Sequence, residues 1–109
     1  MTQIVLQKEA KEFIKSLSDK VRKKIAYTIL KIQDGERNNE IFKKLNDNIW
    51  EIRVTYEGLQ YRLFSFWDTE EGALIVSTHG IIKKTQKTPK KEIKKAEKLR
   101  QEYFRQKRE

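Results

Sequence analysis

Two arginines form the first chemical feature of this sequence. Arg53 and Arg62 lie in the segment WEIRVTYEGLQYRLFSFW, residues 50–67. If this segment folds into a β-hairpin at Glu57-Gly58, the two arginine side chains face each other on one side of it. Like charges that face each other across an antiparallel pair destabilise it by a few tenths to about 1 kcal/mol. A phosphate between them would remove the repulsion, because guanidinium groups bind phosphate through paired hydrogen bonds. The pair therefore indicates an anion-binding site.

A second explanation needs no ligand. Glu51 lies on the same predicted face, and Asp47 is close by in the sequence, so either carboxylate could neutralise the arginines. Long arginine side chains can also spread apart into water. The sequence leaves these explanations open beside the first.

Further residues could share the arginine face. Lys83 and Lys84 follow an apolar segment, residues 73–81, which is typical of a central strand. If that strand pairs antiparallel with the second arm of the hairpin, one or both lysines lie near Arg62. Phe64 shares the face and is the best candidate for stacking on a nucleic-acid base. A single histidine in a strand, such as His79, is more often partly buried and structural than catalytic, so His79 ranks below the arginines as a catalytic candidate.

The elements that position these residues can be read from the hydrophobic periodicity. The pattern predicts an α+β fold in the order β-α-α-β-β-β-α, in one domain over residues 1–109. A small antiparallel sheet packs on an N-terminal helical hairpin, and a basic helix ends the chain. The expected elements are a strand over 3–6, helices over 8–17 and 19–34, a helical turn within 41–48, strands over 49–56, 60–67 and 73–81, and a helix that begins at Pro89 with Thr88 as its cap.

Charge is concentrated at the C-terminal end. Residues 1–82 hold 13 Lys and Arg against 12 Asp and Glu, whereas residues 83–109 hold 12 against 4. Such asymmetry suggests a polyanionic partner. The chain has no cysteine and one histidine, which excludes disulfides and a typical zinc site. No apolar stretch reaches the length of a membrane span and the N-terminus does not read as a signal peptide, so we expect a cytoplasmic protein with no membrane partner and no cofactor.

Four motif blocks then show a family resemblance. FKKLNDNIWEIRV, YRLFSFW, HGIIKKTQKTP and EIKKAEKLRQEY, in this order, resemble the RelE/ParE toxin superfamily and in particular its phage-derived, HigB-like branch. The motifs cover residues 42–103, and residues 1–41 agree only in their strand-helix-helix pattern. The resemblance implies the toxin of a type II toxin–antitoxin system, with a helix-turn-helix antitoxin, that cleaves messenger RNA on the ribosome.

The resemblance also implies roles for particular residues. Arg62 matches a catalytic arginine of the family, and Lys83 and Lys84 match a basic position after the last strand. Glu51 and Arg53 match positions where RelE tends to have lysines, so the acid at 51 is a departure. The basic helix and the segment before it would hold ribosomal RNA by phosphate contacts, through Lys87, Lys90, Lys91, Lys94, Lys95 and Lys98.

Cleavage of RNA without a metal needs a base for the 2′-hydroxyl, cations for the phosphorane and an acid for the leaving oxygen. Arg53 and Arg62, with Lys83 or Lys84, are the candidate cations. Candidates for the base are Glu51, a lysine with a lowered pKa, and His79, and the sequence does not choose among them. Two other functions stay open: a gyrase-directed toxin like ParE, and a basic nucleic-acid-binding module without catalysis.

Overall fold

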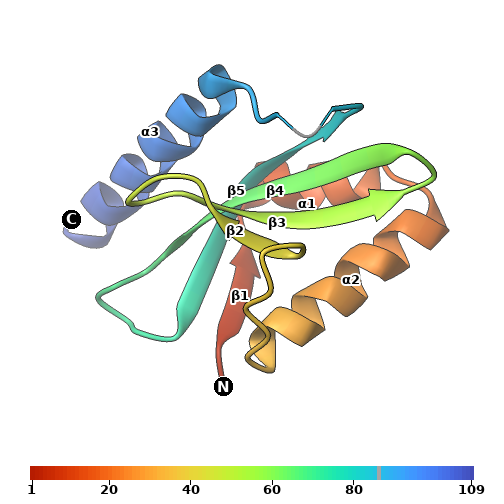
Figure 1. Ribbon diagram of the computed structural model, residues 1–109. Helices are drawn as coiled ribbons and strands as arrows, with labels where there is room; N and C mark the ends of the chain where they lie inside the picture. Colours follow the sequence, from red (N-terminus) through yellow and green to blue (C-terminus); the bar gives the residue numbers. More distant parts are fainter. Residues whose placement is uncertain (86) are drawn as a thin grey trace.

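The computed structural model describes residues 1–85 and 87–109. Figure 1 shows a sheet with helices on both of its sides. The strands lie in the order β1-β5-β4-β3-β2. In chain order the elements are β1 (Gln3–Leu6), α1 (Lys8–Lys15), α2 (Asp19–Gln33), β2 (Phe42–Lys44), β3 (Trp50–Tyr56), β4 (Leu59–Trp67), β5 (Leu74–Lys83) and α3 (Lys90–Lys107).

The α+β class and the predicted order of elements are confirmed, with two differences in the sheet. The helical turn expected within residues 41–48 is wrong, because Phe42–Lys44 forms the short strand β2, which pairs antiparallel with β3. The sheet is also mixed rather than purely antiparallel, since β1 runs parallel to β5.

The β3–β4 hairpin has the predicted register. Tyr56 lies opposite Leu59, and Arg53 lies opposite Arg62. The turn residues Glu57 and Gly58 both have positive φ, at 49° and 79°. Two consecutive positive φ angles match the right-handed twist of the strands they join, and the glycine adopts one of them without steric cost.

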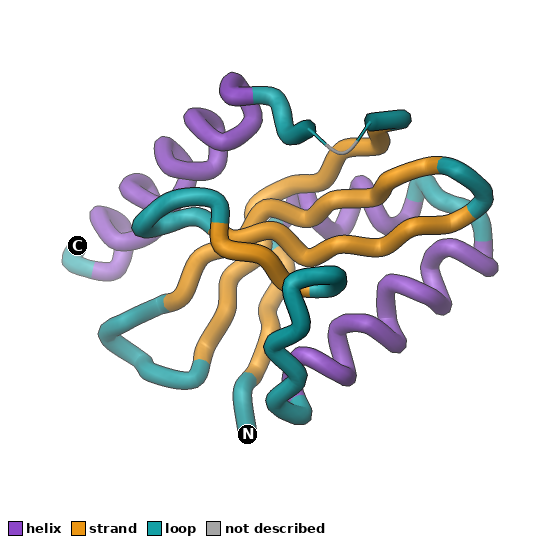
Figure 2. The backbone as a smooth tube through the Cα atoms, viewed as in Figure 1, coloured by secondary structure: helices purple, strands orange, loops and turns teal. Residues whose placement is uncertain are grey.

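The three helices divide between the two faces of the sheet (Figure 2). On one face, α1 packs on β5 and α2 on β3, so each N-terminal helix contacts the sheet more than it contacts the other helix. The ring of Phe13 in α1 lies directly over Gly80, where a Cβ atom would be 2.3 Å from it. On the other face, α3 packs on β4 and β5.

Each face has its own apolar core. The first, under α1 and α2, includes Ile52, Val54, Tyr61 and Leu63, as the alternation of the hairpin predicted. The second, under α3, contains Ile49, Phe64, Phe66, Val76, Ala96 and Phe104. The helix α3 starts one residue later than predicted, with Pro89 rather than Thr88 at its N-cap.

A β-bulge in β5 decides which residues of that strand face α3. Phe64 pairs with His79 and Ser65 with Ser77, so Thr78 is an extra residue. Val76 faces α3 before the bulge. Because one extra residue reverses the alternation that follows, the face toward α3 is taken by His79, Ile81 and Lys83.

Candidate active site

The site begins with three charged residues of the hairpin on the α3 face. Glu51 and Arg53 come from β3 and Arg62 from β4. One carboxylate oxygen of Glu51 lies 3.3 Å from Nε of Arg53 and 3.4 Å from Nε of Arg62. The side chains of Glu51 and Arg62 are buried, at 2% and 1% exposure, whereas Arg53 is 16% exposed. The carboxylate of Glu51 therefore occupies the position between the arginines where the sequence suggested an external anion.

Arg62 is held by its strand neighbours as well. Its Nη2 donates to Oε1 of Gln60 at 2.9 Å, and the same oxygen accepts from the hydroxyl of Thr55 at 2.9 Å. Burial lowers the pKa of Arg62, the nearby charge of Arg53 acts in the same direction, and Glu51 opposes both. Since arginine normally ionises above about 12, the guanidinium remains charged.

Lys83 completes the cluster through a residue that the sequence did not indicate for this role. Its Nζ donates to the hydroxyl of Thr88 at 3.1 Å, and Thr88 donates to the second oxygen of Glu51 at 2.9 Å. Burial is the largest cause of a lowered pKa at Lys83, opposed by Glu51 and supported by Arg62 and Arg53. The cluster of Glu51, Arg53, Arg62, Lys83 and Thr88 is called the arginine cluster below.

The other candidate residues lie outside this cluster. Lys84 is exposed beyond the end of β5, and among the described residues no contact joins it to the cluster. Phe64 is completely buried and stacks on His79 with ring centroids 4.8 Å apart, so it has no exposed surface for a base and that expectation is wrong for this structure. Lys87, Lys90, Lys91 and Lys94 are exposed at the start of α3 and just before it. Gln86, within the third motif block, is outside the described residues.

His79 joins the sheet to α3. Its Nδ1 is 2.8 Å from the hydroxyl of Thr78, and its Nε2 is 3.2 Å from a carboxylate oxygen of Glu92 in α3. Burial lowers the pKa of His79, although Glu92 opposes this. Because both ring nitrogens are engaged and the ring is buried, His79 is the weakest of the candidate bases.

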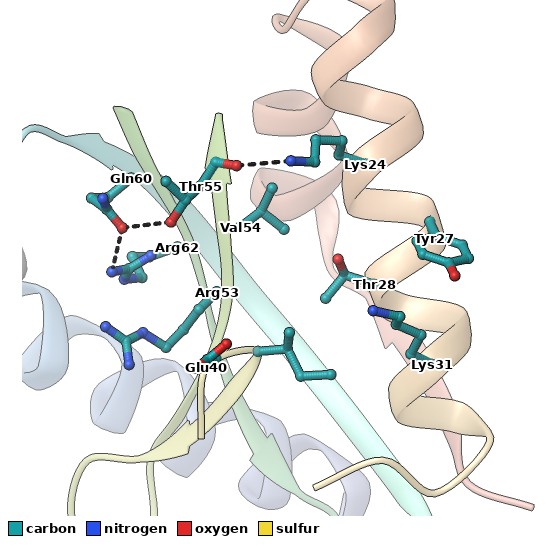
Figure 3. Close-up of a pocket in the computed structure, with 11 residues that line it drawn as sticks. Lys24, Tyr27, Thr28, Lys31, Glu40, Arg53, Val54, Thr55, Gln60 and Arg62 are labelled. Atoms are coloured by element: carbon teal, nitrogen blue, oxygen red, sulfur yellow. Dashed lines mark hydrogen bonds between the residues drawn. The ribbon is translucent and has the colours of Figure 1, made fainter. Parts of the chain in front are cut away.

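Two members of the arginine cluster, Arg53 and Arg62, line a pocket at the surface. A cavity of about 450 Å³ is lined by Arg53, Gln60 and Arg62 on one side of β3, and by Lys24, Thr28 and Lys31 of α2 on the other. Figure 3 shows the Thr55–Gln60–Arg62 hydrogen bonds and the side chain of Arg53 in this pocket. Arg53 also donates to the carbonyl of Asn39 at 3.1 Å.

Metal ligation and membrane insertion are two further properties to consider in the described residues. Within residues 1–85 and 87–109, no group of three His, Asp or Glu side chains could hold a metal ion. None of the described helices is both long enough and apolar enough to cross a membrane.

The sequence and fold were compared with known proteins. Residues 12–101 match the family described as phage-derived protein Gp49-like (DUF891). No curated protein matches the chain significantly. A chain of the intact E. coli RelBE toxin–antitoxin complex superposes with a TM-score of 0.58 at 14% identity, covering 80% of this chain and 100% of that one. The isolated E. coli RelE toxin gives a TM-score of 0.58 at 15% identity, over 87% of this chain and 98% of that one.

These findings confirm the predicted resemblance to a phage-derived family with the RelE fold. The narrower HigB-like assignment stays a prediction. At such low identity, the structural matches carry the fold and not the activity.

Proposed function

This chain belongs to the Gp49-like family of phage-derived proteins, and on that premise we propose that it is the toxin of a type II toxin–antitoxin pair. Its activity would be the cleavage of messenger RNA bound to the ribosome in the cytoplasm. A helix-turn-helix antitoxin would be its partner. The observation that carries the proposal is the arginine cluster, where three cations surround one carboxylate.

The reaction needs no cofactor. The ribose 2′-oxygen attacks the adjacent phosphorus, the bond from phosphorus to the 5′-oxygen breaks, and the products are a 2′,3′-cyclic phosphate and a 5′-hydroxyl. A base takes the 2′-hydroxyl proton and an acid protonates the leaving 5′-oxygen. Arg53 and Arg62 would stabilise the negative charge that develops on the phosphorane oxygens.

Among the candidate bases we favour Lys83. Lys83 is supported by its lowered pKa and its place in the cluster, because a neutral amine can accept a proton. Glu51 is held by two arginines and Thr88, an arrangement better suited to positioning the guanidinium groups than to accepting a proton. Lys84 would support the charge from outside the cluster. Orientation of the message by the ribosome would supply much of the remaining rate acceleration.

The exposed lysines around the start of α3 suit a second part of this function. Positive charge is exposed to solvent at Lys87, Lys90, Lys91 and Lys94. Such side chains bind phosphates with little sequence preference and with strong dependence on salt. We assign them to ribosomal RNA.

The test is induced expression in a bacterium of wild-type protein, Arg62→Ala and Arg53→Ala, with mapping of mRNA 5′ ends soon after induction. The wild type should arrest growth with new ends inside reading frames, and both variants should lose the ends. Arg105→Ala, an exposed arginine of α3, is the matched control and should behave as wild type. Since Arg62 is fully buried, Arg53→Ala keeps the test valid if Arg62→Ala fails to fold. Arrest with DNA damage and no new ends would instead indicate a gyrase-directed toxin.

A further inference from the structure

The edge of the sheet at β3 is only partly covered. The short strand β2 pairs with Trp50, Glu51 and Ile52. The N–H of Arg53 then donates to the carbonyl of Ile41 at 2.8 Å, and the chain before Ile41 turns away through a bond from Phe42 N–H to the carbonyl of Asn38. Because β3 continues to Tyr56, its last three residues form an edge beside which the described part of the chain places no further strand.

The main chain of Thr55 points outward at this edge. Tyr56 and Leu59 flank the two-residue turn and exchange the hairpin's first hydrogen bonds, so Thr55 and Gln60 form a non-hydrogen-bonded pair. The N–H and C=O of Thr55 consequently point away from β4. The carbonyl accepts from Nζ of Lys24 at 3.0 Å, and among the described residues its N–H has no acceptor.

The space beside this edge is the pocket of about 450 Å³ described above. Four cationic side chains line it, Lys24, Lys31, Arg53 and Arg62, whereas Glu40 is the one acid among its described lining residues. Apolar contact is available as well, because Val54 lines the floor and Tyr27 of α2 is 63% exposed. Figure 3 shows α2 and β3 as opposite walls, with Lys24 reaching across to Thr55.

We propose that the open edge of β3 binds an extended acidic segment of a partner protein, which adds a strand to the sheet. Added strands are held by main-chain hydrogen bonds, and their alternate side chains lie on opposite faces. Acidic side chains on one face would meet Lys24 and Lys31, and those on the other would meet Arg53. Naming the antitoxin as the source of this segment rests on the proposed function, whereas the surface itself does not.

Two other roles for this edge are weaker. Lysine at an exposed edge can simply prevent aggregation, but that role does not require a pocket lined by three further cations. RNA would also be attracted to the cations. Binding of its phosphates, however, would leave the outward-pointing strand edge and the apolar surface of Val54 and Tyr27 without a role.

The test uses a synthetic seven-residue peptide of alternating glutamate and threonine, with a lysine-and-threonine peptide as its control. Binding is followed by amide chemical shifts of the purified protein, with the dissociation constant taken from the titration. We expect saturable binding of the acidic peptide, with shifts concentrated in residues 53–56 and 24–31, and none from the basic peptide. No saturable binding up to about 1 mM would overturn the proposal, since an affinity weaker than this is less than about 4 kcal/mol.

Two matched pairs of variants test the mechanism of binding. Thr55→Pro removes the outward N–H while leaving the pairing with β4, and Thr55→Val removes only the hydroxyl. We expect about tenfold or greater weakening from the proline and less than about threefold from the valine, because one lost hydrogen bond and a steric block act together. Lys24→Glu should weaken binding by about tenfold, and Lys23→Glu, an exposed neighbour with the same charge change, by less than about threefold.

Three further measurements separate this proposal from its alternatives. If Thr55→Pro fails to fold, a peptide methylated at alternate amide nitrogens replaces it, because methylation blocks strand addition from the ligand side. Hexauridylate that displaces the peptide and ignores Thr55→Pro would show a nucleic-acid site and reject the proposal. Peptide binding does not depend on cleavage: loss of cleavage with intact peptide binding rejects only the proposed function, and the reverse rejects only this inference.

Discussion

Two buried carboxylates, Glu51 and Asp68, lie on the α3 side of the sheet, and they differ in the balance of charge around them. Asp68 follows β4 and is fully buried. One of its oxygens accepts from the hydroxyl of Tyr103 and from Nζ of Lys107, each at 2.7 Å. The other accepts from the N–H groups of Glu70 and Glu71 at 2.9 and 3.0 Å. The Asp68 cluster thus ties the end of α3 to the β4–β5 turn.

The Asp68 cluster is balanced within the chain. Lys107 also pairs with Glu71 at 3.2 Å, so acids are at least as numerous as cations. The hydrogen bonds that Asp68 accepts overcome its burial and lower its pKa to about 2. Burial and the bond to Asp68 raise the pKa of Tyr103 to about 12. Asp68 is thus held as a carboxylate and Tyr103 as a neutral hydroxyl that donates to it.

The arginine cluster has the opposite balance. Arg53, Arg62 and Lys83 surround the single carboxylate of Glu51, and burial lowers the pKa of both Arg62 and Lys83. Positive charges outnumber negative ones among the described residues of this cluster, and clusters of partly buried charge are often functional. A buried ion pair by itself says little about function, whereas an excess of one sign of charge among the described residues beside a pocket indicates where a ligand of the opposite charge would bind.

The largest expected effect separates the two clusters by activity. Arg53→Ala should lower the rate of mRNA cleavage on purified ribosomes about 100-fold, the usual loss when one group that stabilises transition-state charge is removed. Asp68→Asn should change the rate of the folded protein by less than about twofold. An equal loss in both variants would show that the arginine cluster acts through stability alone.

Stability should show the reverse pattern. Asp68→Asn should lower the free energy of unfolding at pH 7 by about 1–2 kcal/mol. The loss stays in this range because Lys107 is 26% exposed, so that solvent screens its attraction to Asp68. The folded pKa of Asp68 is about 2 against an ordinary value of 3.8, so its stabilisation is present above pH 4 and disappears as the pH falls toward 2. Urea unfolding of wild type and variant from pH 7 to pH 2 measures this. A difference that persists unchanged at pH 2 would contradict the assignment.

Much of the arginine face could be predicted from the sequence. The alternation of Ile52, Val54, Tyr61 and Leu63, with Glu57-Gly58 as the turn, fixed the register that sets Arg53 opposite Arg62. Both signals are local, because a two-residue turn and a period of two determine the pairing of a hairpin.

The parts that failed depend on distant contacts. The hairpin pattern places Phe64 on the arginine face and predicts a role in base stacking. It does not reveal that α3 covers this ring, which lies in one apolar core with Ala96 and Phe104. The bulge at Thr78, which gives Lys83 rather than Lys84 to the cluster, requires the pairing of β4 with β5. The three residues of β2 are too few for a periodic signal, and they form a strand only because β3 offers an edge.

A smaller effect tests the charge excess directly. Glu51→Gln keeps the size of the side chain and removes the negative charge between the arginines. We expect inorganic phosphate to bind about three- to tenfold more tightly, measured as its stabilisation of the protein against heat, because an external anion then has no internal competitor. Asp47→Asn removes the same charge from an exposed position nearby and should leave phosphate binding unchanged. Equal gains in both variants would mean that net charge, and not the cluster, governs anion binding.

Substitution of Thr88 should have the smallest effect on stability, and it tests whether the arginine cluster acts in catalysis or only supports the fold. Its hydroxyl accepts from Lys83 and donates to Glu51, and the residue lies just before α3. Thr88→Val should lower the free energy of unfolding by about 0.5–1 kcal/mol, the usual net value of a hydrogen bond, and Thr69→Val, at an exposed position, should leave it unchanged.

If Thr88 only supports the fold, the cleavage rate of the folded variant stays at the wild-type level. If it positions Glu51 and Lys83 for catalysis, the pH dependence of the rate shifts, because the lysine loses a partner whose contact helps to fix its surroundings. A shift in that profile without a further loss of stability assigns Thr88 to the chemistry, and the Asp68 cluster offers no residue of this kind.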